Sequence, residues 1–314
     1  MGLAIGVDIG GTKIAGGVVD ETGAILARTL RDTPSTDPEA IADAVAAAVR
    51  ELCVGRVVEA VGIGAAGFVD VTRSVVLFAP NLAWRDAPLR EAVETRTGMP
   101  VVVENDANAA AWGEFRFGGA EDVDDAVLVT VGTGVGGGVI LGGQLTRGAH
   151  GVGGELGHMR VVPGGLRCGC GNKGCWEQYA SGTALVREAR ALIESGTPLA
   201  ARLLELAGQS PANLRGPMVT QAAMEGDQAA VELLADLGQW LGEGIASLAA
   251  VLDPSVFVVG GGVSEAGELL LEPARTAMRH HLPARCYRPE PEIRRATLGN
   301  DAGMVGAADL AQMP

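Results

Sequence analysis

The stretch LAIGVDIGGTKIAGGVVD (residues 3–20) sets the architecture of this chain. Two runs rich in β-branched residues flank the turn at residues 10–12, which predicts a strand, a tight glycine turn and a returning strand. The stretch DAVLVTVGTGVGGGVILGGQLTRG (residues 125–148) repeats this plan, with its glycine-rich turn at residues 132–138. The repetition predicts two related halves, each presenting a phosphate-binding hairpin to a shared cleft.

The first of these turns carries groups suited to phosphate chemistry. Asp8 ends the first predicted strand, where a carboxylate can hold a metal-bound water. The amides of Gly10, Gly11 and Thr12, together with the Thr12 hydroxyl, can approach a phosphate. An ordinary glycine hairpin is the alternative, because the spacing alone does not separate the two. Lys13 is not assigned the role of a Walker lysine, since the sequence is not GxxxxGK[ST].

The segment HGVGGELGHMRVVPGGLRCGCGNKGCWEQYAS (residues 150–181) predicts a metal site. Cys168, Cys170 and Cys175 lie within eight residues, and His158 precedes the first of them by ten. One imidazole and three thiolates complete a closed tetrahedral Zn²⁺ site. A disulfide is the alternative, but Cys168 and Cys170 are too close to pair comfortably and nothing in the chain indicates an oxidising compartment. We therefore predict a structural zinc.

The same segment places two carboxylates beside the predicted zinc site. If zinc holds one ring nitrogen of His158, the other ring N–H is free to face a ligand. Glu155 and Glu177 would be brought together by the metal-bound loop, and their oxygens can accept hydrogen bonds from sugar hydroxyls. A solvated surface acid is the alternative for either glutamate alone.

A third informative stretch is MPVVVENDANAAAWGEF (residues 99–115). Its apolar run predicts a buried strand, and the residues after Asp106 predict a helix. Asn105 and Asp106 then fall at the carboxyl end of a strand, where α/β folds bind ligands. Asp106 as a helix N-cap is the equally weighted alternative. Asn81, in FAPNLAW, can donate to and accept from a ligand, although a turn-forming asparagine is the preferred reading of that residue alone.

Composition restricts the function classes. The chain has 314 residues, 47% of them hydrophobic, which allows two domains with proper cores. The net charge of −14, with no run of Lys or Arg, argues against nucleic-acid binding and against binding to anionic membranes. The N-terminus lacks the features of a signal peptide, and no apolar run reaches membrane-spanning length, so we expect a cytoplasmic protein.

The remaining pattern alternates strands and helices, which predicts an α/β protein. Within residues 58–70 we expect a buried strand that runs into a glycine-rich loop around residues 65–67. Within residues 255–264 we expect another that runs into a glycine turn, and residues 292–298 can supply one more strand. Helices are expected at residues 37–52, 86–97, 183–194, 265–281 and 302–311, with further helical pieces from 220 to 252.

Six motifs occur in the order seen in sugar kinases of the ROK family, and the chain resembles that family from Gly6 to about Gly306. They are DIGGT, ENDANAAAWGE, VTVGTGVGGGVI, GELGH, CGCGNKGCWEQYASG and VVGGGVS. The combination of GELGH with CGCGNKGCWE is highly specific, whereas DIGGT or GTGVGGG alone would not be. The resemblance implies a two-domain, actin-like (ribonuclease-H-like) ATPase fold with an interdomain cleft. We expect a small domain at residues 1–108 plus 300–314 and a large, zinc-carrying domain at 109–299. The C-terminal helix would return to pack on the small, N-terminal domain.

The resemblance also implies roles for individual residues. Asp106 would be the general base, with ATP, Mg²⁺ and a structural Zn²⁺ as cofactors, and the protein would be a homo-oligomer (dimer or tetramer). The sugar would be held by Asn81, Asn105, Asp106, Glu155, His158 and Glu177. The nucleotide and its phosphates would be held by Asp8, Gly10, Gly11, Thr12, Lys13, Gly132, Thr133, Gly134, Gly260, Gly261 and Gly262, and the zinc by His158, Cys168, Cys170 and Cys175.

Three functions are compatible with these motifs. The first is phosphorylation of D-glucose at its 6-hydroxyl by ATP. The second is phosphorylation of a related hexose such as mannose, allose or an N-acetylhexosamine, because the motifs fix the chemistry of hydroxyl binding but not the size of the pocket. The third is a sugar-responsive transcription regulator, which needs a DNA-binding domain before DIGGT; only seven residues precede Asp8, so we expect an enzyme. Polyphosphate as phosphoryl donor is disfavoured by the lack of basic runs.

Overall fold

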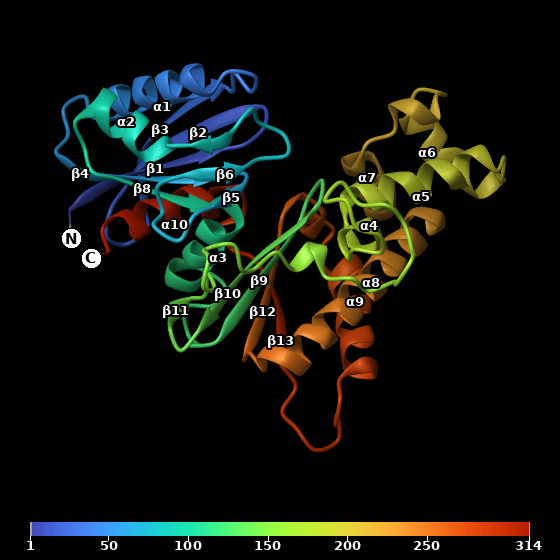
Figure 1. Cartoon of the computed structure of the whole chain (residues 1–314). Coiled ribbons are helices and arrows are strands. Elements are labelled where there is room, and N and C mark those ends of the chain that lie inside the picture. Colours follow the sequence, from blue (N-terminus) through green and yellow to red (C-terminus); the bar gives the residue numbers. More distant parts are fainter. Residues whose placement is uncertain (1, 314) are drawn as a thin grey trace. The chain divides into compact units, whose positions relative to one another are not determined.

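The computed structural model describes residues 2–313, which form two compact units (Figure 1). Unit 1 comprises the chain up to Leu128, Gly138–Gly154 and the chain from Thr297 onward. Unit 2 comprises Val129–Gly137 and Glu155–Ala296.

A mixed five-stranded sheet forms the centre of unit 1, in the order β3-β2-β1-β4-β8. The first three strands are antiparallel, and β1, β4 and β8 run parallel. Every second residue of β3 is exposed, as expected at a sheet edge, whereas β4 is buried over its last six residues. The strands are β1 (Leu3–Ile9), β2 (Lys13–Val19), β3 (Ile25–Asp32), β4 (Val58–Ala65) and β8 (Val101–Asn105).

Helices α1 (Pro38–Leu52) and α2 (Leu89–Thr97) lie on one face of this sheet (Figure 1). The prediction for α1 is confirmed, including its cap: the Asp37 side chain accepts hydrogen bonds from the first turn. The predicted start of α2 at Asp86 is wrong, because Asp86 has a φ of 49° and lies in β7. That strand belongs to a small antiparallel sheet of β5 (Phe68–Val69), β6 (Val76–Phe78) and β7 (Arg85–Ala87).

The other face of the sheet is covered by α10 (Ala302–Ala311), which packs against α3 (Asp106–Phe117) (Figure 1). Glycines allow this close packing. A Cβ on Gly62 would lie 1.7 Å from the Ala307 carbonyl oxygen, and one on Gly306 would lie 1.8 Å from the Ala109 carbonyl oxygen. The C-terminal helix therefore returns to unit 1, as the family resemblance implied. By its internal contacts α3 also belongs to unit 1, whereas we placed the small-domain boundary at residue 108.

A second five-stranded sheet has the order β11-β10-β9-β12-β13. The predicted repeat is present, since β9 and β10 flank a glycine turn as β1 and β2 do. The division between the two units passes through β9 and β10. The strands are β9 (Ala126–Val131), β10 (Val135–Leu141), β11 (Gln144–Leu145), β12 (Val256–Gly260) and β13 (Glu292–Arg295).

Unit 2 is otherwise largely helical, and its longest helix, α8, packs along α9. Gly238 and Gly242 of α8 allow this approach, because a Cβ on Gly242 would lie 2.1 Å from the Ala274 carbonyl oxygen. The predicted helix at residues 265–281 divides at Gly267, whose φ is 58°. The helices are α4 (Glu177–Ala180), α5 (Gly182–Glu194), α6 (Ala201–Leu206), α7 (Gly216–Met224), α8 (Gln228–Leu252) and α9 (Glu268–His281). The short 3₁₀ turns of the chain are η1 (Leu156–His158), η2 (Pro198–Ala200), η3 (Pro211–Asn213), η4 (Gly262–Ala266) and η5 (Gly299–Asp301).

Across residues 2–313, none of the helices combines the length and apolar character needed to cross a membrane.

Candidate active site

The start of α3 is the first part of the candidate site. Asn105 ends β8 and caps the helix, because its side-chain oxygen accepts a hydrogen bond of 2.9 Å from the Asn108 amide. The alternative that Asp106 is the N-cap is therefore wrong. Asp106 is the first helical residue, and its Oδ1 accepts a 2.9 Å hydrogen bond from the Ala107 amide. The Ala107 amide contacts only one oxygen of the Asp106 carboxylate, which leaves the second oxygen for other chemistry.

Asp106 and Asp8 lie in surroundings that disfavour negative charge. Burial raises the pKa of Asp106 to about 6. Burial, followed by the negative charge of Asp106, raises the pKa of Asp8 to about 7. Both residues lie beside Gly64, since a Cβ there would be 3.6 Å from the Asp106 Cα and 3.7 Å from the Asp8 Oδ1. Two carboxylates with shifted pKa values in one place are typical of a functional site.

The two asparagines predicted to bind the sugar both belong to unit 1. The Asn105 side-chain amide donates a 3.1 Å hydrogen bond to the Gly67 carbonyl oxygen, so the orientation of this residue is fixed at both ends of its amide group. Asn81 is exposed and lies beside the first glycine turn, since a Cβ on Gly11 would be 3.6 Å from the Asn81 Cβ.

The first glycine turn is closed by a 3.0 Å hydrogen bond from the Gly10 amide to the Lys13 carbonyl oxygen. It is also tied to the end of β3, because the Thr33 amide donates to the Thr12 carbonyl oxygen and the Thr33 hydroxyl donates to that of Gly10. The Lys13 ammonium forms an exposed ion pair of 2.5 Å with Asp32. Lys13 is thus occupied on the surface of the sheet.

The second glycine turn lies against the start of α5 in unit 2. The Gly182 amide donates a 2.8 Å hydrogen bond to the Gly132 carbonyl oxygen, and the Thr183 hydroxyl donates one of 2.6 Å to that of Thr133. Gly261, with a φ of 82°, packs on the residue before this turn, since a Cβ would lie 2.6 Å from the Val131 carbonyl oxygen. The glycines predicted to hold the nucleotide in unit 2 are therefore brought together.

These glycines open onto a cavity of about 1160 Å³ that lies wholly within unit 2. Its volume slightly exceeds the range of about 300–1,000 Å³ that is usual for small-molecule sites, so it has room for a large ligand such as a nucleotide. Its walls come from the second glycine turn, from the start of η4 and from α4, α5, η3 and α7. Its polar or flexible lining includes Gly132, Thr133, Gln178, Thr183, Arg187, Arg190, Glu194, Arg215, Thr220 and Gly262.

Sequence reasoning did not identify the three arginines of this cavity. They come from α5 and from the segment before α7, and each donates to backbone carbonyl oxygens: Arg187 to Gln178, and both Arg190 and Arg215 to Ala212 and Leu214. The spacing of Arg187 and Arg190 on the predicted helix at 183–194 places them on one helical face, but only the fold shows that this face lines a cavity.

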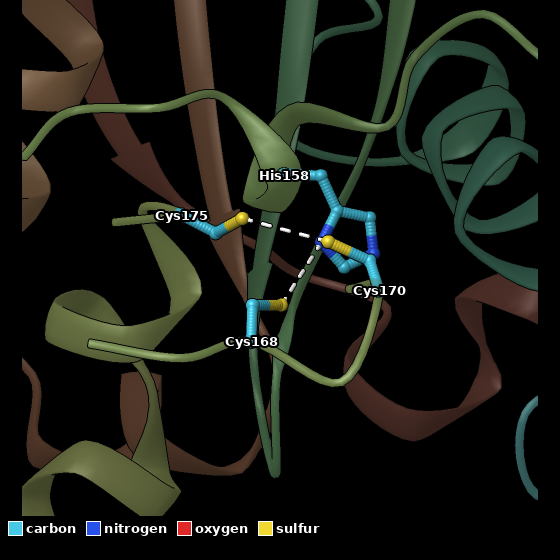
Figure 2. A group of neighbouring side chains, drawn as sticks. All are labelled: His158, Cys168, Cys170 and Cys175. Atoms are coloured by element: carbon cyan, nitrogen blue, oxygen red, sulfur yellow. Dashed lines mark hydrogen bonds between the residues drawn. The ribbon is translucent and has the colours of Figure 1, made fainter. Parts of the chain in front are cut away.

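The predicted metal cluster is present in unit 2. The ligand atoms of His158, Cys168, Cys170 and Cys175 all lie within 4.8 Å of one another. Figure 2 shows the four side chains pointing toward a common centre, with His158 on η1 and the cysteines on the loop before α4. The Cys168 sulfur is 3.6 Å from the His158 Nδ1, and the Cys170 and Cys175 sulfurs are 3.6 Å apart. Three sulfurs and one imidazole nitrogen at these separations fit a tetrahedral zinc.

The two glutamates predicted beside the cluster lie on either side of His158. Its Nδ1 faces the cysteines, and its Nε2 is 4.0 Å from a Glu155 carboxylate oxygen. Glu177 lies 3.9 Å from the Nδ1, and its Oε1 is 3.0 Å from the Cys168 sulfur. Unit 2 thus presents two carboxylates and an imidazole next to the metal cluster, as predicted from the sequence.

The chain matches the ROK family over residues 4–313. It is 54% identical to a glucokinase of Streptomyces coelicolor, over the whole chain and 99% of that protein. A ROK family glucokinase from Streptomyces griseus, solved in complex with glucose and AMPPNP, superposes with a TM-score of 0.91 at 55% identity and 99% coverage of both chains. The chain is also 30% identical to the xylose repressor of Bacillus subtilis, covering 98% of this chain but 77% of that protein.

The actin-like ATPase fold predicted from the six motifs is the fold of these solved relatives, and its two mixed sheets with flanking helices are present here. The family match spans both glycine turns, the start of α3 and the metal cluster. The chain belongs to the ROK family.

Proposed function

We propose that this chain is an ATP-dependent glucokinase, which transfers the γ-phosphoryl group of ATP to the 6-hydroxyl of D-glucose. The observation that carries the proposal is the carboxylate of Asp106, which lies at the carboxyl end of a parallel strand and has a pKa raised by burial. Support for the donor and acceptor comes from the Streptomyces griseus glucokinase, which was solved with glucose and AMPPNP.

Asp106 is the proposed general base. Its carboxylate would accept the proton of the 6-hydroxyl as the hydroxyl oxygen bonds to the γ-phosphorus and the bond to ADP breaks. A pKa of about 6 suits this role, because the group is mostly ionised at neutral pH yet still basic enough to take a proton.

The sugar-binding set is divided between the two units. Unit 1 supplies Asn81 and Asn105, whose amides can donate to and accept from hydroxyls. Unit 2 supplies Glu155, His158 and Glu177, whose carboxylates and ring N–H suit the same partners. The close grouping of the three residues of unit 2 around η1 supports their common role.

The nucleotide set is divided in the same way. In unit 1 the amides of Gly10, Gly11 and Thr12 would contact phosphate oxygens, and in unit 2 Gly132, Thr133 and Gly134 would do so. Gly260, Gly261 and Gly262 would lie near the adenosine in the cavity of unit 2. Asp8, whose charge is disfavoured without a cation, fits a position beside Mg²⁺. Mg²⁺ would neutralise charge on the phosphates.

The four-residue cluster of unit 2 fits a structural zinc. Four protein ligands leave no open position for a catalytic water. His158 would bind the metal through its Nδ1, which fixes the ring so that its Nε2 side faces Glu155. Its contribution to catalysis would therefore be the orientation of His158, Glu155 and Glu177.

A substrate panel tests the proposal. The full-length protein is assayed with Mg²⁺ and ATP against glucose, mannose, allose, N-acetylglucosamine and N-acetylmannosamine, with ADP release measured by a coupled assay. We expect the highest kcat/KM with glucose. A higher kcat/KM with another hexose would transfer the assignment to that sugar and leave the chemistry unchanged.

A second arm replaces ATP by polyphosphate. One structural relative is a polyphosphate/ATP-glucomannokinase from Arthrobacter, 28% identical to this chain. We expect no turnover with polyphosphate, because the arginines of the cavity already donate to backbone carbonyl oxygens.

The family resemblance further leads us to propose that the protein is a cytoplasmic homo-oligomer, either a dimer or a tetramer. Light scattering would measure the mass of the oligomer.

A further inference from the structure

Glu104 directly precedes the two candidate site residues of unit 1 and is almost completely buried, with 1% of its surface exposed. Its Oε1 accepts hydrogen bonds from the Asn105 amide at 2.9 Å and from the Asn108 side-chain amide at 3.1 Å. These two donors lie on either side of Asp106 in the sequence. One carboxylate therefore binds the backbone of the residue before the proposed base and the side chain of a residue after it.

The same carboxylate is paired with two arginines. The Arg147 Nε lies 2.8 Å from the Oε2 and 3.0 Å from the Oε1 of Glu104, and the Arg73 Nε lies 3.1 Å from the Oε2. Arg147 is itself 9% exposed, whereas Arg73 is more accessible. This leaves a buried negative charge between two positive ones at the end of β8.

Arg147 continues the network into the loop after β5. Its two terminal nitrogens donate to the carbonyl oxygens of Val71 at 3.0 Å and of Asp70 at 2.9 Å. Hydrogen bonds within the loop stabilise it, since the Asp70 carboxylate accepts from the Ser74 and Val75 amides at 2.8 Å each. The start of α3 is thus bound, through one guanidinium, to a loop that has its own internal bracing.

A stabilising role alone does not explain this arrangement. Removing three charged groups from water is costly, and well-packed apolar residues of similar volume often stabilise a fold as well or better. Unlike apolar contacts, the hydrogen bonds of the charged network are directional, so they hold Asn105 and Asn108 in one orientation. Catalysis depends on such positioning, since a displacement of about 1 Å can cost about 100-fold in rate.

We infer that Glu104 and Arg147 form a positioning pair that fixes the start of α3 so that Asp106 and Asn105 are correctly oriented toward the sugar. Neither residue is proposed to touch the substrate. The inference rests on the proposed function, because it assigns the orientation of the base of that reaction.

The test uses Arg147→Lys in the full-length protein. Lysine keeps the buried positive charge but cannot donate to Glu104 and to the two carbonyl oxygens of the loop at once. We expect kcat to fall about 10- to 100-fold. We expect the KM for ATP to stay within about 2-fold, because Arg147 bonds to Glu104, Val71 and Asp70, and none of these is assigned to the nucleotide. Arg73→Gln, which removes the more exposed partner, should give the same pattern with a smaller loss.

Asp309→Asn is the matched control. Asp309 is a buried carboxylate that binds the same helix further along, accepting from the Trp112 ring N–H at 2.7 Å and from Arg116 at 3.2 Å. It should lower the melting temperature while kcat stays near that of the wild type. If Arg147→Lys is destabilised to the same extent as Asp309→Asn and also keeps its kcat, the pair is structural only and the inference is wrong.

Failure of the function can be told apart from failure of the inference. If the wild type prefers another hexose, the same comparison of kcat with the KM for ATP is made with that hexose. If the wild type phosphorylates no sugar, the proposed function fails. The inference then fails with it, whatever the variants do.

Discussion

Two regions of this molecule hold parts of the same proposed sugar-binding set by different means. In unit 2, the ligand atoms of His158 and of three cysteines lie within 4.8 Å of one another, all in one short segment. In unit 1, Asn105 and Asp106 are held by a buried network that joins β8, α3 and two loops. With the proposed zinc bound, the first arrangement would concentrate its stabilising free energy in one metal ion, whereas the second distributes it over many weaker contacts. Their responses to single changes should therefore differ in size.

The largest effect is expected at the metal cluster. Cys175→Ala removes one of four ligands from a buried position and should abolish zinc binding, measured by elemental analysis. Metal binding contributes about 10 kcal/mol or more at such structural sites, so the melting temperature should fall sharply. Calorimetry should show a greater loss of glucose binding than of ATP-analogue binding, because the cavity that we assign to the nucleotide does not include the cluster residues.

Cys286→Ala is the control for this prediction. Cys286 is an exposed free thiol outside the cluster, so the variant should keep its zinc and its glucose affinity. Zinc-free Cys175→Ala that still bound glucose at full affinity would show that the metal does not organise the sugar-binding residues of unit 2.

The next largest effect is expected at the base. Asp106→Asn should lower kcat about 100-fold or more, because an amide cannot take the proton of the hydroxyl. The helix should persist, since Asn105 and not Asp106 provides the N-cap of α3. Circular dichroism and steady-state kinetics together would check both expectations.

Asp37→Asn serves as the comparison, because Asp37 caps α1 and no role in catalysis is assigned to it. Asparagine caps a helix about as well as aspartate, so this variant should match the wild type in kcat and stability. A kcat near the wild-type value in Asp106→Asn would remove the proposed base from the mechanism.

A smaller effect is expected at the far end of α3, where Glu114 is also buried. Its carboxylate accepts from the Gly119 amide at 2.8 Å, from the Thr297 amide at 3.0 Å and from the Leu298 amide at 2.8 Å. Glu114→Gln places an amide donor opposite these donors and should cost about 1–3 kcal/mol. The melting temperature should fall by several degrees while the zinc content stays unchanged. A loss as large as that of Cys175→Ala would contradict the view that unit 1 distributes its stability.

The four-residue cluster was predictable from the sequence because all of its residues lie close together in the chain. Its ligands lie in one segment at spacings that a tetrahedral ion requires, and no distant residue is needed to complete it. Other local features were likewise predictable, because each depends on neighbours in the chain. They are the glycine turns, the cap of α1 and the bounds of α10. The family resemblance then supplied the fold.

The networks of unit 1 were not predictable, because their partners are far apart in the sequence. Arg147 lies 43 positions from Glu104, and Thr297 lies 183 positions from Glu114. The neighbouring sequence does not distinguish Glu104 from Asp106. Nevertheless Glu104 forms ion pairs with two arginines, whereas the pKa of Asp106 is raised. The predicted start of α2 was wrong for a related reason. Asp86 lies in a strand of a small sheet, and the residues around it do not predict that strand.

The smallest effect is expected from pH, and it separates the activity of unit 1 from its stability. The pKa of Asp106 is raised from 3.8 to about 6, so the base becomes protonated as the pH falls through 6. We expect kcat/KM for glucose to fall about tenfold per pH unit below about pH 6. Stability should change in the opposite direction. Because the folded protein binds this proton more tightly than the unfolded chain, the contribution of Asp106 to the free energy of unfolding rises as the pH falls from about 6 toward 4. The raised pKa of Asp8, about 7, adds a contribution of the same sign. Kinetics and chemical denaturation of the wild type and of Asp106→Asn over pH 4.5–8 would measure both. In Asp106→Asn, the residual kcat/KM should no longer fall below about pH 6. If it still falls there, a group other than Asp106 causes the pH dependence.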